Sequence, residues 1–171
     1  MTEREFMNRI ANGKVDFLQS FIDILRKKRI PFCVIGGLAV NAYAEPLVSL
    51  DLDIVVVSKR LDELISILRK KFRIKKYPYS VNVYTKGSDF RIQIQTEDRY
   101  QPFVKRASKK NVLGYKIPVA CIEDVFTGKI WATTDRRRRQ SKRDKDLLDI
   151  KRLIEVKPRL RSLLPQELKK Q

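Results

Sequence analysis

Two aspartates, Asp51 and Asp53, stand one residue apart at the start of an apolar run, 54–57. In a β-strand, residues two apart point to the same face, so these two carboxylates project together while Leu52 and Ile54 face the other way. Carboxylates this close repel each other unless a cation lies between them. Mg²⁺ is the natural candidate, because it takes oxygen ligands from one or two carboxylates and from substrate phosphates. We therefore expect a metal site at Asp51 and Asp53.

A glycine pair, Gly36-Gly37, lies upstream, between an apolar stretch at 32–35 and a short helical stretch at 38–44. Where a strand hands over to a helix, backbone N–H groups and the helix dipole can meet a phosphate, and glycine lets the backbone approach it closely. For the glycines and the aspartates to share one site, the two strands must be antiparallel neighbours joined by the short helix. This arrangement is inferred from the chemistry, and it predicts a site for a phosphate group with Mg²⁺.

The composition excludes several other chemistries. The chain has no histidine, which removes Ser-His-Asp and Cys-His catalysis and most enzymatic zinc sites. Cys33 and Cys121 lack CxxC spacing and are expected to be buried thiols. The net charge of +18 indicates a polyanionic partner or a Lys- and Arg-rich solubilising surface, and the charge alone does not decide between them.

The length of 171 residues fits one domain with a substantial core. No stretch has the apolar length of a membrane span, and the first twelve residues contain no signal-peptide core. We expect a cytoplasmic protein without a membrane partner.

The periodicity of apolar residues predicts the elements that position these groups. The expected helices cover 6–25 (broken at Asn12-Gly13), 38–44, 62–71, 122–133 and 142–155; the expected strands cover 32–35, 50–57, 72–77, 81–85 and 90–96, with a hairpin at 112–119 that turns at Leu113-Gly114. Pro158 and Pro165 are expected to interrupt regular structure in a short, frayed C-terminal tail. This order predicts one α/β or α+β domain, 1–171, with a mixed sheet flanked by helices, a core at about 30–120 and C-terminal helices at about 121–165.

The glycine pair followed by Asp-x-Asp on a strand resembles the signature of the nucleotidyltransferase-fold superfamily (the DNA polymerase β-like group). The chain is most similar to the AbiEii and minimal-nucleotidyltransferase types, closely over 32–57 and more weakly over 122–153. This resemblance implies that Gly36 and Gly37 contact the triphosphate and that Asp51 and Asp53 are catalytic metal ligands. One nucleotide is then transferred to a hydroxyl with loss of pyrophosphate, a reaction of positioning and charge neutralisation.

Gln93 is a departure from the family pattern. The family adds a third carboxylate on a later strand, and Gln93 occupies that position here, between Arg91 and Gln95 on the same face. An amide oxygen can ligate a metal but neutralises less charge and cannot accept the proton of a nucleophile. Three accounts remain open: Asp89 substitutes along the strand, a remote acid serves as the base, or activity is weak or lost.

The weaker match contains Lys129 and the helix that carries Asp146 and Asp149. The resemblance implies that Lys129 reaches a phosphate and that Asp146 acts as a base or organises the lysine. Charge pairing on a helix surface, at i, i+3 and i, i+4, is the alternative. We prefer that alternative for Asp149 and the phosphate role for Lys129.

The arginine run 136–139 is typical of a solvated loop, although it would also suit the phosphates of an RNA acceptor. Five aromatic residues that could stack on bases are scattered and are expected mostly in the core: Tyr77, Tyr79, Tyr84, Tyr100 and Trp131.

Two functions remain, and a purely structural role would gain support only if neither nucleotides nor nucleic acid bind. The leading hypothesis is a Mg²⁺-dependent nucleotidyltransferase that acts on a hydroxyl-bearing acceptor, with RNA ahead of a protein or a small molecule. The rival is a catalytically weak or inactive protein that binds nucleotides or nucleic acid, such as a component of a toxin–antitoxin pair. Loss of Asp51 would abolish Mg²⁺-linked function in the first case and leave polyanion binding intact in the second.

Overall fold

The computed structural model describes residues 1–2, 5–6, 9 and 16–171. The first part of the expected N-terminal helix, including its break at Asn12-Gly13, lies largely outside these residues. Its second part is α2 (Phe17–Lys27), which is capped by Asp16 through a hydrogen bond from the Gln19 amide (2.9 Å) to its carboxylate. The apolar spacing of α2 buries one face, including Phe17 and Phe21.

The centre of the molecule is a seven-stranded sheet in the order β3-β4-β5-β2-β1-β7-β6. The strands are β1 (Phe32–Ile35), β2 (Asp51–Val56), β3 (Arg73–Tyr77), β4 (Ser80–Tyr84), β5 (Arg91–Gln95), β6 (Ser108–Val112) and β7 (Tyr115–Val119). The pairs β2–β5 and β1–β7 are parallel and the others are antiparallel. The expected mixed sheet is therefore confirmed.

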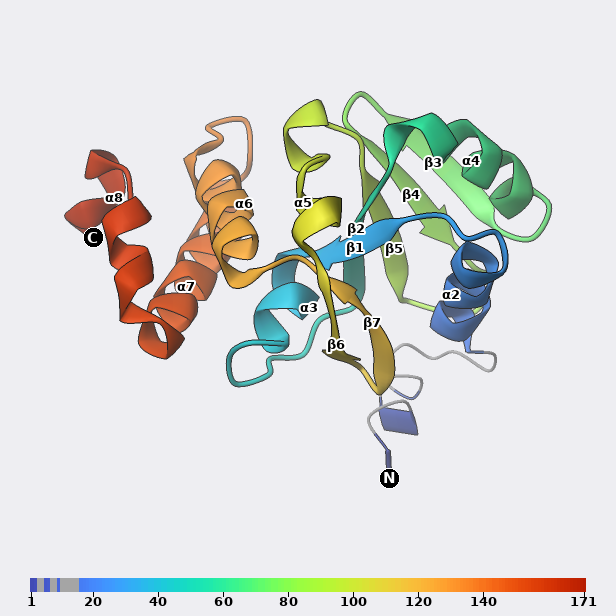
Figure 1. Ribbon diagram of the computed structural model, residues 1–171, viewed down its shortest axis with the longest axis horizontal. Helices are drawn as coiled ribbons and strands as arrows, with labels where there is room; N and C mark the ends of the chain where they lie inside the picture. Colours follow the sequence, from blue (N-terminus) through green and yellow to red (C-terminus); the bar gives the residue numbers. More distant parts are fainter. Residues whose placement is uncertain (3–4, 7–8, 10–15) are drawn as a thin grey trace.

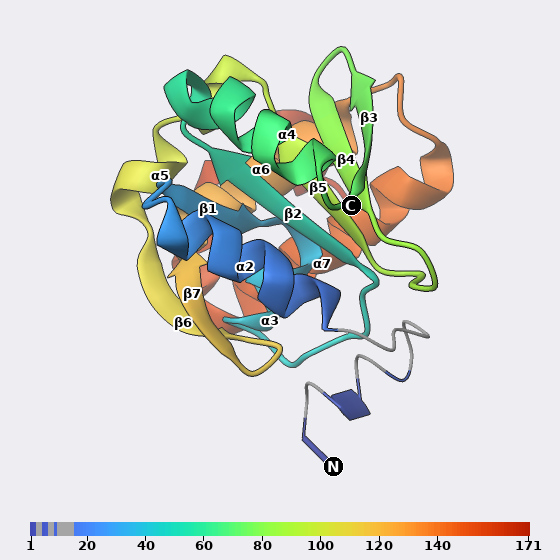
Figure 2. The ribbon, with the colours of Figure 1, turned by 90° about the vertical axis from the view of Figure 1, so that its right-hand side faces the viewer.

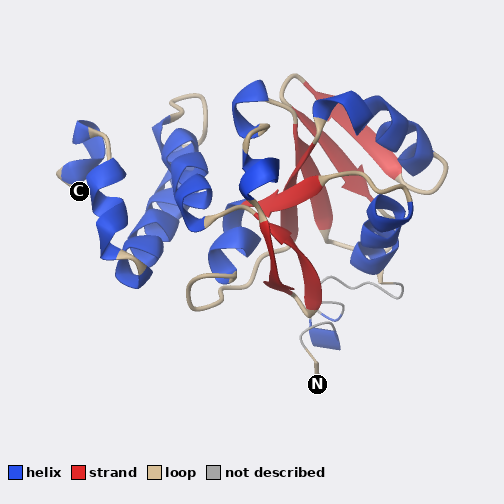
Figure 3. Ribbon diagram, in the orientation of Figure 1, coloured by secondary structure: helices blue, strands red, loops and turns tan. Residues whose placement is uncertain are grey.

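Helices cover the sheet on both sides (Figures 1 and 3). One layer holds α2 and α4 (Leu61–Arg69), which lie in front of the sheet in Figure 2. The other holds α3 (Gly36–Asn41), α6 (Ile122–Thr134) and α7 (Gln140–Val156). Short helical turns occur at η1 (Ser58–Arg60), η2 (Asp98–Tyr100) and α5 (Phe103–Arg106).

The connection between β1 and β2 is the one that the chemistry required. The two strands are antiparallel neighbours, with Ile35 opposite Asp53, and α3 joins them. The helix begins at Gly36, two residues earlier than the sequence predicted, because both glycines belong to its first turn. The helical turn continues to Ala44, whose amide donates to the Val40 carbonyl at 2.8 Å.

The predicted hairpin is longer than the sequence indicated. Its turn at Leu113 (φ 53°) and Gly114 (φ 81°) is confirmed, and two positive φ values suit a tight hairpin turn. The first arm, β6, starts at Ser108 rather than at Val112. β6 is an edge strand, where lysines discourage pairing with further strands. Its sequence is therefore polar and lacks the apolar pattern from which a strand is predicted.

The C-terminal tail is not frayed, which corrects the prediction made from its prolines. It forms η3 (Pro158–Leu163) and α8 (Gln166–Lys169), and Leu160 and Leu168 are buried. In the part of the chain that the structure describes, no helix combines the length and apolar character needed to cross a membrane.

Candidate active site

Asp51 and Asp53 lie on the same face of β2, as the alternation of the strand predicts. The intervening Leu52 and the following Ile54 and Val56 are buried on the opposite face. Asp53 pairs with Ile35 on one side and with Gln93 of β5 on the other. The metal-ligand candidates Asp53 and Gln93 are thus brought onto adjacent strands.

Gly36 meets the carboxylate of Asp53 directly. Its backbone is left-handed (φ 71°), and a Cβ at this position would lie 2.3 Å from Oδ2 of Asp53. Gly37 has ordinary surroundings, since its Cβ would lie 3.9 Å from Oγ of Ser49. The two glycines therefore differ: Gly36 is required for the turn to pass the carboxylate, and Gly37 is not.

A small cavity of about 100 Å³ opens beside Asp53. Five of the predicted catalytic, metal-binding and phosphate-binding residues line it: Gly36, Asp53, Gln93, Lys129 and Asp146. Gly37 and Asp51 do not line it. The other lining residues come from β1, β5 and the segments that carry η2, α5, α6 and the α6–α7 loop: Ile35, Gln95, Tyr100, Phe103, Asp124, Val125, Gly128, Ala132 and Arg138.

Asp51 has a different environment from Asp53. Its side chain is 44% exposed, and its Oδ1 accepts a hydrogen bond from Nε of Arg91 at 3.0 Å. Arg91 is the residue opposite Asp51 in β5. Sequence reasoning placed Arg91 on this face but did not pair it with Asp51, because the pairing depends on a parallel register between strands far apart in the chain.

Burial shifts the proton affinity of Asp53. It raises the pKa of this carboxyl to about 6; the nearby Asp51 acts in the same direction, while Lys129, Arg91 and Arg138 oppose the shift. A carboxylate held in such a place gains from a cation beside it. Asp53 is therefore suited to metal binding.

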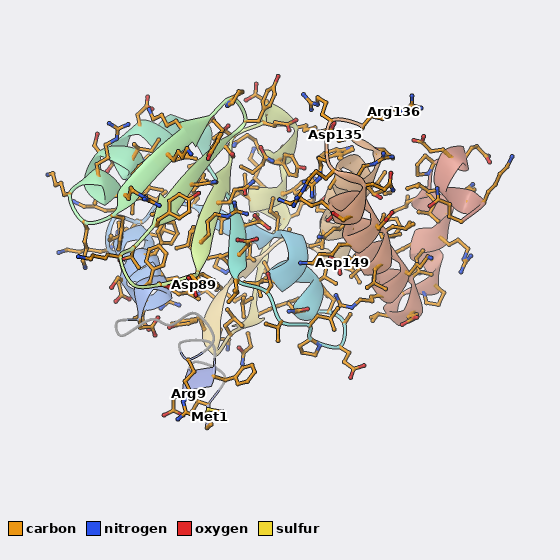
Figure 4. All side chains as sticks on the ribbon, turned by 180° about the vertical axis from the view of Figure 1, so that it is seen from behind. Met1, Arg9, Asp89, Asp135, Arg136 and Asp149 are labelled. Atoms are coloured by element: carbon orange, nitrogen blue, oxygen red, sulfur yellow. The ribbon has the colours of Figure 1, made fainter. Side chains whose placement is uncertain are left out.

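The third carboxylate of the family pattern has no counterpart beside Asp53. Gln93 occupies the adjacent strand position, and Asp89 lies on the loop ahead of β5 (Figure 4), away from the cavity lining. Among the described residues, no group of three His, Cys, Asp or Glu side chains is placed to hold a metal ion. The oxygen donors available to Mg²⁺ are the carboxylates of Asp51 and Asp53 and the amide of Gln93. Their chemistry fits the ion, with less charge than three carboxylates would give.

Lys129 of α6 is 7% exposed and bridges two carboxylates of α7. Its Nζ lies 2.8 Å from Oδ1 of Asp146 and 2.8 Å from Oδ2 of Asp149. Burial lowers the pKa of Lys129, but the two carboxylates outweigh it and raise the pKa overall. Lys129 therefore carries its positive charge at the wall of the cavity.

Both oxygens of Asp146 are engaged. Oδ1 is held by Lys129, and Oδ2 lies 2.8 Å from Nη2 of Arg138 on the α6–α7 loop. Asp146 therefore holds both Lys129 and Arg138 in place at the wall of the cavity.

Asp149 is part of the same buried network, between α7 and α3 (Figure 4). It is 2% exposed, and its Oδ1 lies 2.7 Å from Nη1 of Arg152, the i+3 pairing that the sequence allowed. Arg152 also donates to Oδ1 of Asn41 (3.1 Å) and to the Glu45 carbonyl, which ties α7 to the end of α3. The charge pairing of Asp149 is thus observed, but in the interior instead of on a helix surface.

Sequence reasoning missed Arg138 and Asp124. Arg138 lines the cavity, although nothing in the run 136–139 distinguishes it from its neighbours, and Arg136 projects away from the molecule (Figure 4). Asp124 is 7% exposed and accepts two hydrogen bonds from Arg106, at 2.8 and 2.9 Å.

The aromatic residues are divided between core and surface. Tyr100 is buried, lines the cavity and packs edge-on against Trp131 (ring centroids 5.0 Å apart). Tyr77 and Tyr79 are 43% and 53% exposed, contrary to the expectation that most of these aromatics lie in the core. Cys33 is a buried free thiol, and Cys121 is a partly buried one.

Comparisons with known proteins agree with this geometry. A family model described as "Nucleotidyl transferase AbiEii toxin, Type IV TA system" matches residues 24–170. No curated protein sequence matches the chain significantly.

Several solved structures share the fold. ANT(2'')-Ia in complex with adenylyl-2''-tobramycin superposes with a TM-score of 0.59 at 12% identity, over 89% of this chain and 90% of that one. The lincosamide antibiotic adenylyltransferase LnuA, with lincomycin bound, gives 0.57 at 16% identity over 81% and 95%. An antigenic nucleotidyltransferase-like protein from Paracoccidioides brasiliensis gives 0.55 at 18% over 96% and 84%. The predicted nucleotidyltransferase fold is confirmed.

Proposed function

Because the chain belongs to the AbiEii nucleotidyltransferase family, we propose that it transfers a nucleotide from a Mg²⁺-bound nucleoside triphosphate to a hydroxyl group of an acceptor, with RNA favoured. The observation that carries this proposal is the partly buried carboxylate of Asp53, which lines a cavity together with Gln93 and the buried, cationic Lys129. A nucleotidyltransferase needs a carboxylate that binds a metal and a cation that binds phosphate, and these residues supply both.

The metal would be held by Asp51 and Asp53, with the amide oxygen of Gln93 as a weaker donor. When bound, Mg²⁺ supplies neutralisation of the charge on the triphosphate. Asp51 shares its charge with Arg91, 3.0 Å away, so Asp53 is the stronger ligand of the pair. Gln93 cannot take the proton of the attacking hydroxyl, which leaves that proton to the solvent, to a phosphate oxygen or to a more distant acid.

Lys129 and Arg138 would face the triphosphate. Lys129 is fixed by Asp146 and Asp149, so its ammonium group is oriented before the nucleotide arrives. The guanidinium of Arg138 donates to Asp146 through Nη2, and its other N–H groups would be donors for phosphate oxygens. Asp146 would then act by positioning both cations, and the backbones of Gly36 at the cavity and of the adjacent Gly37 would contact the phosphates.

The acceptor is assigned from charge. The chain carries a net charge of +18, which attracts a polyanion, and the exposed arginines 136, 137 and 139 stand near the cavity residue Arg138. Two structural neighbours are described with antibiotics, so a small molecule is the comparison that an experiment must include.

The description of the family also names a toxin of a type IV toxin–antitoxin system. We extend the proposal to this chain: it acts as one component of such a pair. The second candidate, a catalytically inactive component that binds nucleotides or nucleic acid, is favoured by one observation, the neutral Gln93 where the family pattern has an acid.

Transfer of radioactive label from each of four α-³²P nucleoside triphosphates decides between the two candidates. The protein is incubated with Mg²⁺ and with total RNA, a mixture of unrelated proteins or an aminoglycoside as the acceptor. We expect label in RNA, lost in Asp53→Asn and retained in Asp62→Asn, an exposed control on α4. RNA binding without labelling of any acceptor would overturn catalysis and favour the inactive component.

A further inference from the structure

The face of β2 that carries Asp51 and Asp53 is continuous with one face of β5, β4 and the edge strand β3. Asp53 lies opposite Gln93 of β5, Gln93 lies opposite Asn82 of β4, and Asn82 lies opposite Lys75 of β3. Directly opposite residues in neighbouring strands project to the same side of the sheet. A row of polar side chains therefore runs from the candidate metal ligand to the last strand, over three strand spacings or about 14 Å.

We call this surface the open sheet face; its members beyond the active site are Arg73, Lys75 and Tyr77 of β3, Asn82 and Tyr84 of β4, and Arg91 of β5. Arg73, Lys75 and Tyr77 are exposed, Tyr84 and Arg91 are partly exposed, and Asn82 is only 4% exposed. The other face of the same strands carries Val81, Val83, Ile92 and Ile94, which are buried in the core. Figure 2 shows α2 and α4 on one side of the sheet, and the buried residues of both helices belong to the same core cluster as these four strand residues. The open sheet face is thus the polar side of a sheet covered on its other side.

Cations and aromatic rings alternate on the open sheet face. The guanidinium of Arg73 lies 4.8 Å from the ring centroid of Tyr84, and Nζ of Lys75 lies 5.5 Å from that of Tyr77. At the β3–β4 turn, the guanidinium of Arg137, from the α6–α7 loop, lies 5.7 Å from the ring centroid of Tyr79. Both segments lie at the top of Figures 1 and 2.

Beyond β2, whose Asp51 pairs with Arg91 at 3.0 Å, the strands of this surface contribute no acidic residue. The sequences of β3, β4 and β5 contain no Asp or Glu. Within 16–171, no carboxylate forms an ion pair with Arg73 or Lys75. The positive charges of β3 are therefore available to an external anion.

We propose that the open sheet face binds a single-stranded polynucleotide, with one end of the strand directed to Asp53. Arg73 and Lys75 meet its phosphates, and Tyr77 and Tyr84 offer rings on which bases stack, the combination by which single strands are held without sequence preference. This inference rests on the proposed function, because it takes the bound strand to be the acceptor. A cationic small acceptor would be repelled by the same residues.

Fluorescence anisotropy of a 5′-labelled, twelve-nucleotide single-stranded RNA tests this surface without any nucleotide transfer. Arg73→Ala/Lys75→Ala is compared with Arg69→Ala/Lys70→Ala at the end of α4. Arg69 and Lys70 are exposed, so the control also removes two positive charges, but away from the open sheet face. We expect the first pair to weaken binding about tenfold or more and to reduce the salt slope by about 1.4, or about 0.7 for each lost phosphate contact. The control pair should change affinity less than twofold.

Stacking is tested by Tyr77→Ala, which should weaken RNA binding about fivefold or more. A polyglutamate of similar charge serves as a competitor without bases, and it should displace the RNA poorly. Equal losses in both double variants, no binding by the wild-type protein, or equal competition by polyglutamate would overturn the proposal. The last result would identify an acidic protein as the fitting partner.

Different experimental results would refute this inference and the proposed function. If Arg73→Ala/Lys75→Ala binds and labels RNA as the wild-type protein does, the surface is wrong and the transfer activity stands. If wild-type protein binds RNA through these residues but labels no acceptor, the surface stands and the enzyme is wrong.

Discussion

Gly36 and Asp53 are in such close contact that no side chain fits between them: a Cβ on Gly36 would lie 2.3 Å from Oδ2 of Asp53. The left-handed φ of 71° at Gly36 adds a second reason for glycine. The sequence indicated that this glycine allows the backbone to approach a phosphate. The structure shows that it first allows the β1–α3 turn to pass the carboxylate that would bind the metal.

Gly36→Ala should therefore lower the free energy of unfolding by more than the cost of backbone strain alone. Gly87 is the matched control, because it has a similar φ (81°) and a Cβ placed there would meet no atom within 4 Å. We expect Gly87→Ala to lower the free energy of unfolding by about 1 kcal/mol. Gly36→Ala should lower it by about 2 kcal/mol more, from the overpacking against Asp53. Urea denaturation of both variants measures the difference, and equal losses would contradict the contact.

The pKa of Asp53 predicts a pH-dependent gain in stability for Asp53→Asn. Burial raises this pKa to about 6, above the value near 3.9 in an unfolded chain, so the folded state binds the proton more tightly. The stabilisation from this protonation is present below about pH 4 and is lost as the pH rises through 6. Without Mg²⁺, Asp53→Asn should be about 1–3 kcal/mol more stable than the wild-type protein at pH 8 and similar to it at pH 4.

Urea unfolding at the two pH values, with Asp62→Asn as an exposed control, checks this result. A gain of the same size at both pH values would show that the charge of Asp53 is not the cause.

Lys129→Met should be strongly destabilising. The substitution leaves Asp146 and Asp149 in the interior without their shared cation, and breaking a buried pair in this way costs about 3–5 kcal/mol. Lys145→Met, at an exposed position on α7, should change the free energy of unfolding by about 0.5 kcal/mol or less. Thermal and urea unfolding of the two variants give the comparison. A cost below about 1 kcal/mol for Lys129→Met would show that the network is not held as described.

Gln93→Asp should restore a third carboxylate beside Asp53. We expect tighter Mg²⁺ binding and faster transfer, since three acids neutralise the ion better than two. Gln93→Asn is the control of similar size without the charge. The variant proteins are titrated with Mg²⁺ by calorimetry at pH 8. No gain in metal affinity or turnover for Gln93→Asp would reject the idea that Gln93 stands in for a ligand.

The parts of the site that are local in sequence could be predicted from it. The Asp51–Asp53 face follows from strand alternation, and the antiparallel β1–β2 pair follows from the need to bring the glycines to the aspartates. A pairing of Lys129 with Asp146 was implied only by the family resemblance, and the second pairing, with the buried Asp149, was not predicted, because spacing along α7 does not reveal which helix packs against it.

Long-range register explains the other omissions. The Arg91–Asp51 pair and the open sheet face depend on how β2, β5, β4 and β3 align, and the sequence contains no direct signal of that alignment. The solvent exposure of Tyr77 follows from its position on an edge strand, whereas its aromatic character pointed to the core.

Calorimetric titration of the four nucleoside triphosphates, with and without Mg²⁺, tests the central claim most directly. The wild-type protein is compared with Asp51→Asn/Asp53→Asn. The account predicts binding that depends on Mg²⁺ and that the double variant loses. Absence of binding, or binding that neither the metal nor the substitutions affect, would contradict a nucleotidyltransferase site at these aspartates.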